Sequence, residues 1–181
     1  MTIKSVRDLE AVVTRARQVA ESVEKMCANP GATPSDLFFL IGAEYPTGAF
    51  SRKIAQRKSE QGRAPSYLYR FEWQTPISGG RMKSPHALEI TFVFDHAGEP
   101  LAPRIAPDSP EVHELAAEMS GRWIAFARTG DPNTGNAPHW PAYSAAERAT
   151  MIFDGKRRVE NDPSRQERLA IERILFPSET P

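Results

Sequence analysis

The chain has 181 residues, of which 40% are hydrophobic and 25% are charged. These proportions are ordinary for a globular chain that is long enough to bury a core. Lysine and arginine together number 23, as do aspartate and glutamate, so the formal net charge is zero. This balance excludes a strong positive field, and we therefore expect no nucleic-acid partner and no anionic-membrane partner.

Targeting and redox features are few in this sequence. No apolar run approaches the roughly 18 residues that a membrane span needs. The first twenty residues carry charge in every turn, so we expect no secretory signal and a cytoplasmic location. The single cysteine, Cys27, excludes an internal disulfide and a cysteine-rich zinc site. It lies at the C-terminal side of a predicted helix, which indicates an inert thiol.

Two helices are expected near the N-terminus. Apolar residues at three- and four-residue steps predict an amphipathic helix over residues 5–26. Thr33, Pro34 and Asp36 then form a typical helix start, with a cap, a first-turn proline and an acid three residues after the cap. We expect a short apolar helix from there through Leu40.

A third helix is expected over about residues 47–61. Its apolar residues Phe50, Ile54 and Ala55 are expected to face inward, with basic residues outward. Gly62 is expected to end it.

The clearest strand is residues 66–73, where an aromatic side chain occupies every second position, as one pleated face requires. A loop is expected over residues 75–85. Residues 90–94 are apolar and fit either a strand or a buried turn of helix. Residues 96–110 hold four of the 16 prolines and are expected to be irregular.

The longest expected helix covers about residues 110–129, where one apolar stripe ends at Gly130. Short strands are expected at residues 150–153 and near Val159. A charged, partly helical tail is expected over residues 166–175.

The sequence contains neither a complete zinc-binding motif nor the pentapeptide of a serine nucleophile elbow. His113 and Glu114 begin a zinc-binding pattern, but Ala117 stands where the second histidine is needed. No Gly-x-Ser-x-Gly pentapeptide occurs, and we expect no metal and no cofactor. The four histidines of the chain, each a weak candidate by itself, are His86, His96, His113 and His139.

His86 is the histidine best placed for catalysis. It follows the predicted strand 66–73 and a glycine-bearing loop, and residues at strand ends can converge on a site in a parallel α/β sheet. An imidazole that titrates near neutrality suits general base catalysis. A residual site that pairs His86 with Ser84 or Ser51 is a weak alternative, because Ser84 lies only two residues away.

Five blocks of sequence occur in an order that is known from one family of enzymes. They are residues 35–39, 64–73, 86–94, 123–133 and 139–143, with residues 151–154 beyond them. The third begins His-Ala-Leu-Glu, and the fourth contains Phe-Ala-Arg-Thr-Gly-Asp-Pro-Asn. Together they resemble the C-terminal portion of type-B carboxylesterases, the cholinesterase-like branch of the α/β-hydrolases. The resemblance covers about residues 36–163.

This resemblance implies an α/β fold class, namely the C-terminal part of an α/β-hydrolase fold, helix-rich with a few strands. Residues 1–181 would form a single C-terminal fragment, with an N-terminal helix at 1–30, the family-like region at 34–163 and a tail at 164–181. His86 would be the triad histidine, which takes the proton of a serine during attack on an ester and returns it to the leaving alcohol.

The family's serine elbow, oxyanion-hole glycines and triad acid all precede the histidine, and the sequence contains no match to them. The upstream carboxylates Asp8 and Glu10 lie on a charged helical face and are expected to be solvated. We therefore expect a chain that is inactive alone and that acts on a small-molecule ester once an N-terminal half completes it. That half would come from the same polypeptide or from a partner chain carrying the serine. The alternative is a non-enzymatic module that forms a homo-oligomer through an exposed sheet edge at residues 66–73.

Overall fold

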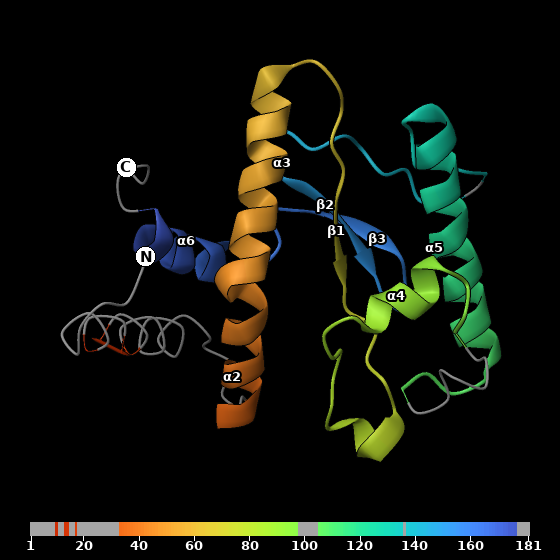
Figure 1. The fold of residues 1–181 in the computed structure, drawn as a ribbon, viewed down its shortest axis with the longest axis horizontal. Helices are drawn as coiled ribbons and strands as arrows, with labels where there is room; N and C mark the ends of the chain where they lie inside the picture. The colour runs from red at the N-terminus through yellow and green to blue at the C-terminus, as the bar shows by residue number, and fades with distance from the viewer. Residues whose placement is uncertain are drawn as a thin grey trace. The chain divides into compact units, whose positions relative to one another are not determined.

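A computed structural model describes residues 33–97, 105–135 and 137–176, together with residues 10, 13, 14 and 17 (Figure 1). Those four isolated residues are helical, and the rest of the helix predicted at 5–26 lies outside the described residues, as do Cys27 and Asp8. The chain divides into two compact units. The first is residues 1–54 with 163–181, and the second is residues 55–162.

In the first unit, helix α2 (Pro34–Ala43) begins where the sequence predicts. The backbone N–H of Asp36 donates to Thr33 Oγ1 at 3.3 Å, and the backbone N–H of Thr33 donates to the Asp36 carboxylate at 3.0 Å. This reciprocal capping box satisfies two N–H groups that a helix start leaves without partners. The helix runs three residues beyond its expected end at Leu40.

A π-helical turn, η1 (Glu44–Gly48), joins α2 to α3 (Ala49–Gln61). The prediction that Phe50 and Ile54 face inward is wrong, since they are 48% and 68% exposed. The backbone kinks in this turn, where Tyr45 is non-helical with a φ of −116° and a ψ of 115°, and Ala49 directly after the turn is fully buried. The inward prediction for Ala55 is confirmed.

The C-terminal tail is helical, as expected, in α6 (Arg165–Leu175). Ile171 of α6 and Ala49 of α3 form the buried centre of a small apolar cluster. The ring of Phe176 meets that of Phe50 edge-on, with centroids 5.6 Å apart, so Phe50 is only partly covered.

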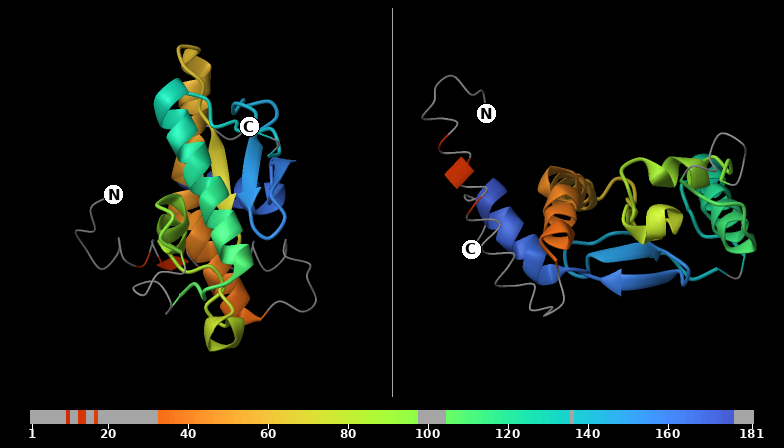
Figure 2. Two further views of the ribbon diagram at one scale, coloured as in Figure 1. Left: turned by 90° about the vertical axis from the view of Figure 1, so that its right-hand side faces the viewer. Right: turned by 90° about the horizontal axis from the view of Figure 1, so that it is seen from below.

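The second unit contains a three-stranded sheet in the order β1 (Leu68–Phe71), β2 (Ala149–Phe153), β3 (Arg158–Asn161). The strands β1 and β2 are parallel, and β2 and β3 are antiparallel (Figure 2). All three predicted strands are confirmed, although β1 is shorter than residues 66–73. Beyond β1, the N–H groups of Glu72 and Trp73 both donate to the carbonyl of Phe153.

Two helices, α4 (Leu88–Val93) and α5 (Pro110–Thr129), lie on one face of this sheet (Figure 2). Residues 90–94 thus belong to helical structure rather than to a strand. Helix α5 has the predicted bounds, because Ser109 caps its start and Gly130 ends it at a φ of 78°. Within the described part of the chain, no helix is long and apolar enough to cross a bilayer.

The aromatic face of β1 packs against α4 and α5 and is not exposed. Tyr69 contacts Trp123 of α5 at a ring-centroid distance of 5.0 Å. Phe71 and Trp73 both contact Phe92 of α4, at 5.1 and 5.2 Å. The alternative of a self-associating module assumed that this aromatic face is exposed, and the structure does not support that assumption.

A polar clamp holds the segment that leads from α5 into β2. Asn133 accepts from the Trp140 backbone N–H at 2.7 Å and donates to the Trp140 carbonyl at 3.0 Å. Hydrogen bonds from Asn133 also hold the pKa of the Asp131 carboxyl below its usual value. The Trp140 indole then donates to the Leu68 carbonyl of β1 at 3.1 Å, so this segment is tied to the sheet.

Phe92 should dominate the stability of the second unit. Phe92 is fully buried, whereas Phe94, two residues further on, is 66% exposed. Phe92→Ala should lower the free energy of unfolding by about 3–5 kcal/mol, and Phe94→Ala by less than about 1 kcal/mol. Urea denaturation of the two variants measures this difference, and equal losses would contradict the packing described here.

Candidate active site

His86 lies in the segment that joins β1 to α4, beyond the carboxyl end of the strand. Within this segment, residues 75–85 are a loop as predicted, with one short 3₁₀ turn, η2 (Ile77–Gly80). The His86 side chain is exposed, and it has no hydrogen-bond or ion-pair partner among the residues that the structure describes.

The root of this loop is fixed by two buried residues. Thr75 is fully buried, its hydroxyl donates to the Ile105 carbonyl, and it accepts from the Ile77 N–H at 3.2 Å. Trp73 donates from its indole to Glu111 of α5 at 3.1 Å. The Trp73 contact ties the loop to the first turn of α5, and the Thr75 contact ties it to the segment that precedes this helix.

The loop is closed by backbone hydrogen bonds on both sides of His86. The Thr75 N–H donates to the Lys83 carbonyl at 3.0 Å, and the Leu88 N–H donates to the Pro85 carbonyl at 3.1 Å. Ala87 has a φ of 68°, a left-handed conformation that is uncommon for a residue with a Cβ. Leu88 is buried directly after it, so the chain turns sharply at His86 and enters the core at once.

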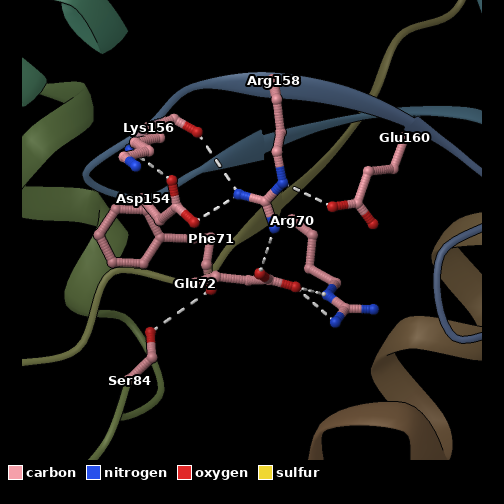
Figure 3. Close-up of polar contacts among 8 residues, drawn as sticks. All are labelled: Arg70, Phe71, Glu72, Ser84, Asp154, Lys156, Arg158 and Glu160. Carbon is pink, nitrogen blue, oxygen red and sulfur yellow. Dashed lines mark hydrogen bonds and ion pairs between the residues drawn. The ribbon is translucent and has the colours of Figure 1, made fainter.

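The carboxylates at the nearby sheet end are paired with arginines and not with His86 (Figure 3). Arg158 contacts Asp154 at 2.5 Å, Glu160 at 2.6 Å and Glu72 at 3.4 Å. The hydrogen bonds to Asp154 and Glu160 raise the pKa of the Arg158 guanidinium. Arg70 pairs with the other side of the Glu72 carboxylate. Glu72 is thus held by two cations, and it is not positioned to orient an imidazole.

Glu89, three residues after His86, is a half-buried carboxylate. Burial, and after it the charge of Glu89, raise the pKa of the Tyr69 hydroxyl. No hydrogen bond joins Glu89 to His86 in the described residues. Glu89 therefore does not orient the His86 imidazole through a hydrogen bond.

The other residues considered from the sequence form no site. His113 pairs with Asp108 at 2.6 Å, while Glu114 pairs with Arg157 at 2.5 Å. No cluster of potential metal ligands occurs among the described residues. His96 and His139 are exposed, as are Glu10 and Ser51.

The Ser84 hydroxyl is directed to the protein backbone. It donates to the Phe71 carbonyl at 3.5 Å (Figure 3), and no hydrogen bond joins it to His86. The structure therefore gives the weak alternative of a Ser84–His86 pair no support.

Sequence reasoning did not single out Thr75 or Glu111, although both hold the histidine loop. The hydrogen bond from Thr75 reaches a residue 30 positions away, and that from Trp73 reaches one 38 positions away. Such contacts leave no local pattern of spacing or polarity. Trp73 alone belongs to a pattern that the sequence shows, namely the alternating aromatic residues of the predicted strand.

Comparison with known proteins gives one consistent result. The model described as "Carboxylesterase family" matches residues 21–171. Para-nitrobenzyl esterase of Bacillus subtilis is 37% identical over 125 residues, which are 69% of this chain and 24% of that protein. Phenmedipham hydrolase of Pseudarthrobacter oxydans is 29% identical over 158 residues, which are 84% of this chain and 31% of that protein.

A solved structure agrees with these matches. A carboxylesterase of Geobacillus stearothermophilus superposes with a TM-score of 0.71 at 34% identity, over 84% of this chain and 31% of that one. The chain thus spans about a quarter to a third of the length of these relatives.

The buried hydroxyl of Thr75 should control the order of the histidine loop. Thr75→Val keeps the shape but removes both hydrogen bonds, and it should lower the free energy of unfolding by about 1–3 kcal/mol. Amide exchange across residues 77–88 should become faster than in the unsubstituted chain. Thr75→Ser keeps the hydroxyl and should restore slow exchange. Unchanged exchange in the valine variant would show that the hydroxyl does not hold the loop.

Proposed function

This chain belongs to the carboxylesterase family, and from that membership we propose that it is the histidine-bearing part of a serine carboxylesterase. Its fold is the C-terminal part of an α/β-hydrolase, helix-rich with a few strands, as predicted. The proposed reaction is hydrolysis of a small carboxylic ester. It takes place when the serine-bearing part of the domain is supplied by the same or another polypeptide.

The observation that carries this proposal is the setting of His86. The family-like block 86–94 puts this histidine on a closed, anchored loop past the end of β1, with its imidazole exposed and without a partner. A catalytic base must be held rigidly and must still reach its substrate group, and His86 meets both conditions.

In the proposed reaction the imidazole first acts as a base. It takes the proton of the serine hydroxyl as the serine oxygen attacks the ester carbonyl. The protonated imidazole then returns that proton to the leaving alcohol, and it repeats the cycle with water to release the acid. An acid that fixes the imidazole, and donors that stabilise the oxyanion, would belong to the serine-bearing part.

A second proposal is a non-enzymatic module that self-associates. One observation favours it: β1 is an edge strand, because it pairs only with β2 among the described residues. An open strand edge can pair with a second copy of the chain. The burial of the aromatic face of β1 by α4 and α5 leaves only the backbone edge for this role.

Hydrolysis of p-nitrophenyl acetate tests the catalytic proposal. We define the complementary part as the Bacillus subtilis para-nitrobenzyl esterase without the segment that this chain matches. The chain alone should hydrolyse this ester no faster than free imidazole does, whereas the chain mixed with the complementary part should hydrolyse it catalytically. His86→Ala should reduce that turnover by a factor of about 100 or more, because general base catalysis is lost.

His96→Ala is the matched control, since His96 is also exposed and lies ten positions further along the chain. It should leave turnover unchanged. Turnover by the chain alone that exceeds free imidazole and is lost in His86→Ala would contradict the proposal that the site needs a complementary part.

A further inference from the structure

The Glu111 carboxylate is the polar partner of a buried tryptophan. Glu111 lies in the first turn of α5, and its Oε1 accepts the hydrogen bond that the Trp73 indole donates at 3.1 Å. Trp73 is only 6% exposed, so water is a poor alternative partner for its indole N–H. Loss of the Glu111 acceptor would therefore leave the donor of a buried ring without its hydrogen bond.

Three elements of the second unit meet at this carboxylate. Gly155 lies in the turn between β2 and β3, and a Cβ at that position would lie 3.3 Å from Glu111 Oε1, so the turn passes close to this oxygen. The Trp73 backbone is fixed as well, because its N–H donates to the Phe153 carbonyl at the end of β2 at 3.1 Å. The Glu111 side chain therefore joins the end of β1, the β2–β3 turn and the start of α5.

The Trp73 ring connects this junction to the helix that follows His86. Trp73 and Phe92 pack with their ring centroids 5.2 Å apart and their planes inclined at 54°. Phe92 is fully buried in α4, which begins two residues after His86. Closely packed rings leave no free space between them, so one ring cannot turn without moving the other. A change in the orientation of the Trp73 indole would therefore shift α4 and the histidine that precedes it.

We propose that Glu111 is a positioning residue for His86: its carboxylate fixes the Trp73 indole, and that ring fixes α4 directly after the histidine. This inference rests on the proposed function, and it adds a residue that acts through Trp73 and not on the ester. Catalysis depends steeply on placement, because a displacement of about 1 Å can lower a rate about 100-fold. Glu111 thus controls the rate of a reaction to which it contributes no atom.

Two substitutions of Glu111 separate its hydrogen bond from its charge. Glu111→Ala and Glu111→Gln both remove a negative charge from the first turn of α5, but only Glu111→Gln keeps an acceptor oxygen for the Trp73 indole. The Leu88 N–H, which donates to the Pro85 carbonyl, reports on the backbone around His86 in the chain alone. Its amide exchange should become about tenfold or more faster in Glu111→Ala and should stay within about twofold in Glu111→Gln.

Turnover of p-nitrophenyl acetate by the chain mixed with the complementary part gives the second readout. Glu111→Ala should lower kcat about tenfold or more with KM unchanged, because placement of the base matters in the transition state, and Glu111→Gln should restore kcat. Trp73→Phe removes the donor but keeps an aromatic ring, so adding Glu111→Ala to it should cause no further loss of kcat. A residue that only stabilises the fold would leave the kcat of the folded chain unchanged.

Glu114→Ala is the matched control. Glu114 is also an exposed acid of α5, but it pairs with Arg157 at 2.5 Å and not with Trp73. Its replacement should leave both the exchange at Leu88 and kcat unchanged.

The outcomes separate the positioning role from the catalytic role. Full turnover by His86→Ala would refute the proposed function, whereas the exchange at Leu88 needs no complementary part and decides by itself whether Glu111 holds the histidine segment. Loss of turnover in His86→Ala together with normal exchange and normal kcat in Glu111→Ala would overturn the positioning role alone. Equal effects of Glu111→Ala and Glu111→Gln would also overturn it, by assigning the effect to the charge of the helix end.

Discussion

The second unit depends on the contact of Phe92 with the aromatic face of β1. Phe92 is fully buried against Phe71 and Trp73, and it belongs to the same short helix that starts directly after His86. A side chain packed on two aromatic rings has little freedom to shift. The position of the histidine relative to the sheet is therefore fixed from within the core, while its imidazole remains in solvent.

Buried hydrogen bonds hold the loop that carries His86, in addition to the aromatic packing. Trp73 connects the loop to the first turn of α5, and Thr75 connects it to Ile105 before that helix. A displacement of the loop would therefore break buried hydrogen bonds as well as apolar contacts. The carboxylates near the end of the sheet, Glu72 and Asp154, form ion pairs with Arg158 and Arg70. These ion pairs join β3 to the segment at the end of β1 and to the turn after β2, and none of them includes His86. Among the described residues, no carboxylate contacts the His86 imidazole.

The sequence predicts those elements whose bounds depend on neighbouring residues, such as helix caps and alternating strand residues. Helix α5 has its predicted bounds because Ser109, Pro110 and Gly130 act within one turn of its ends. The alternating aromatic residues correctly indicated β1, but they did not indicate that α4 and α5 cover its aromatic face. His86 was predicted from a motif, and its role as a catalytic residue stays a prediction. By contrast, the inward placement of Phe50 and Ile54 was wrong, because the chain kinks at Tyr45 before α3 and buries Ala49 instead. The anchoring role of Thr75 depends on a partner 30 residues away, and only the folded chain brings the two together.

The central claim is that this fold presents His86 to a serine on another part of a carboxylesterase domain. A crystal structure of the 181-residue chain bound to the complementary part would test it most directly. The account predicts an imidazole nitrogen of His86 within about 3 Å of the nucleophilic serine oxygen. A complex in which His86 faces solvent, or in which another histidine meets that serine, would contradict it.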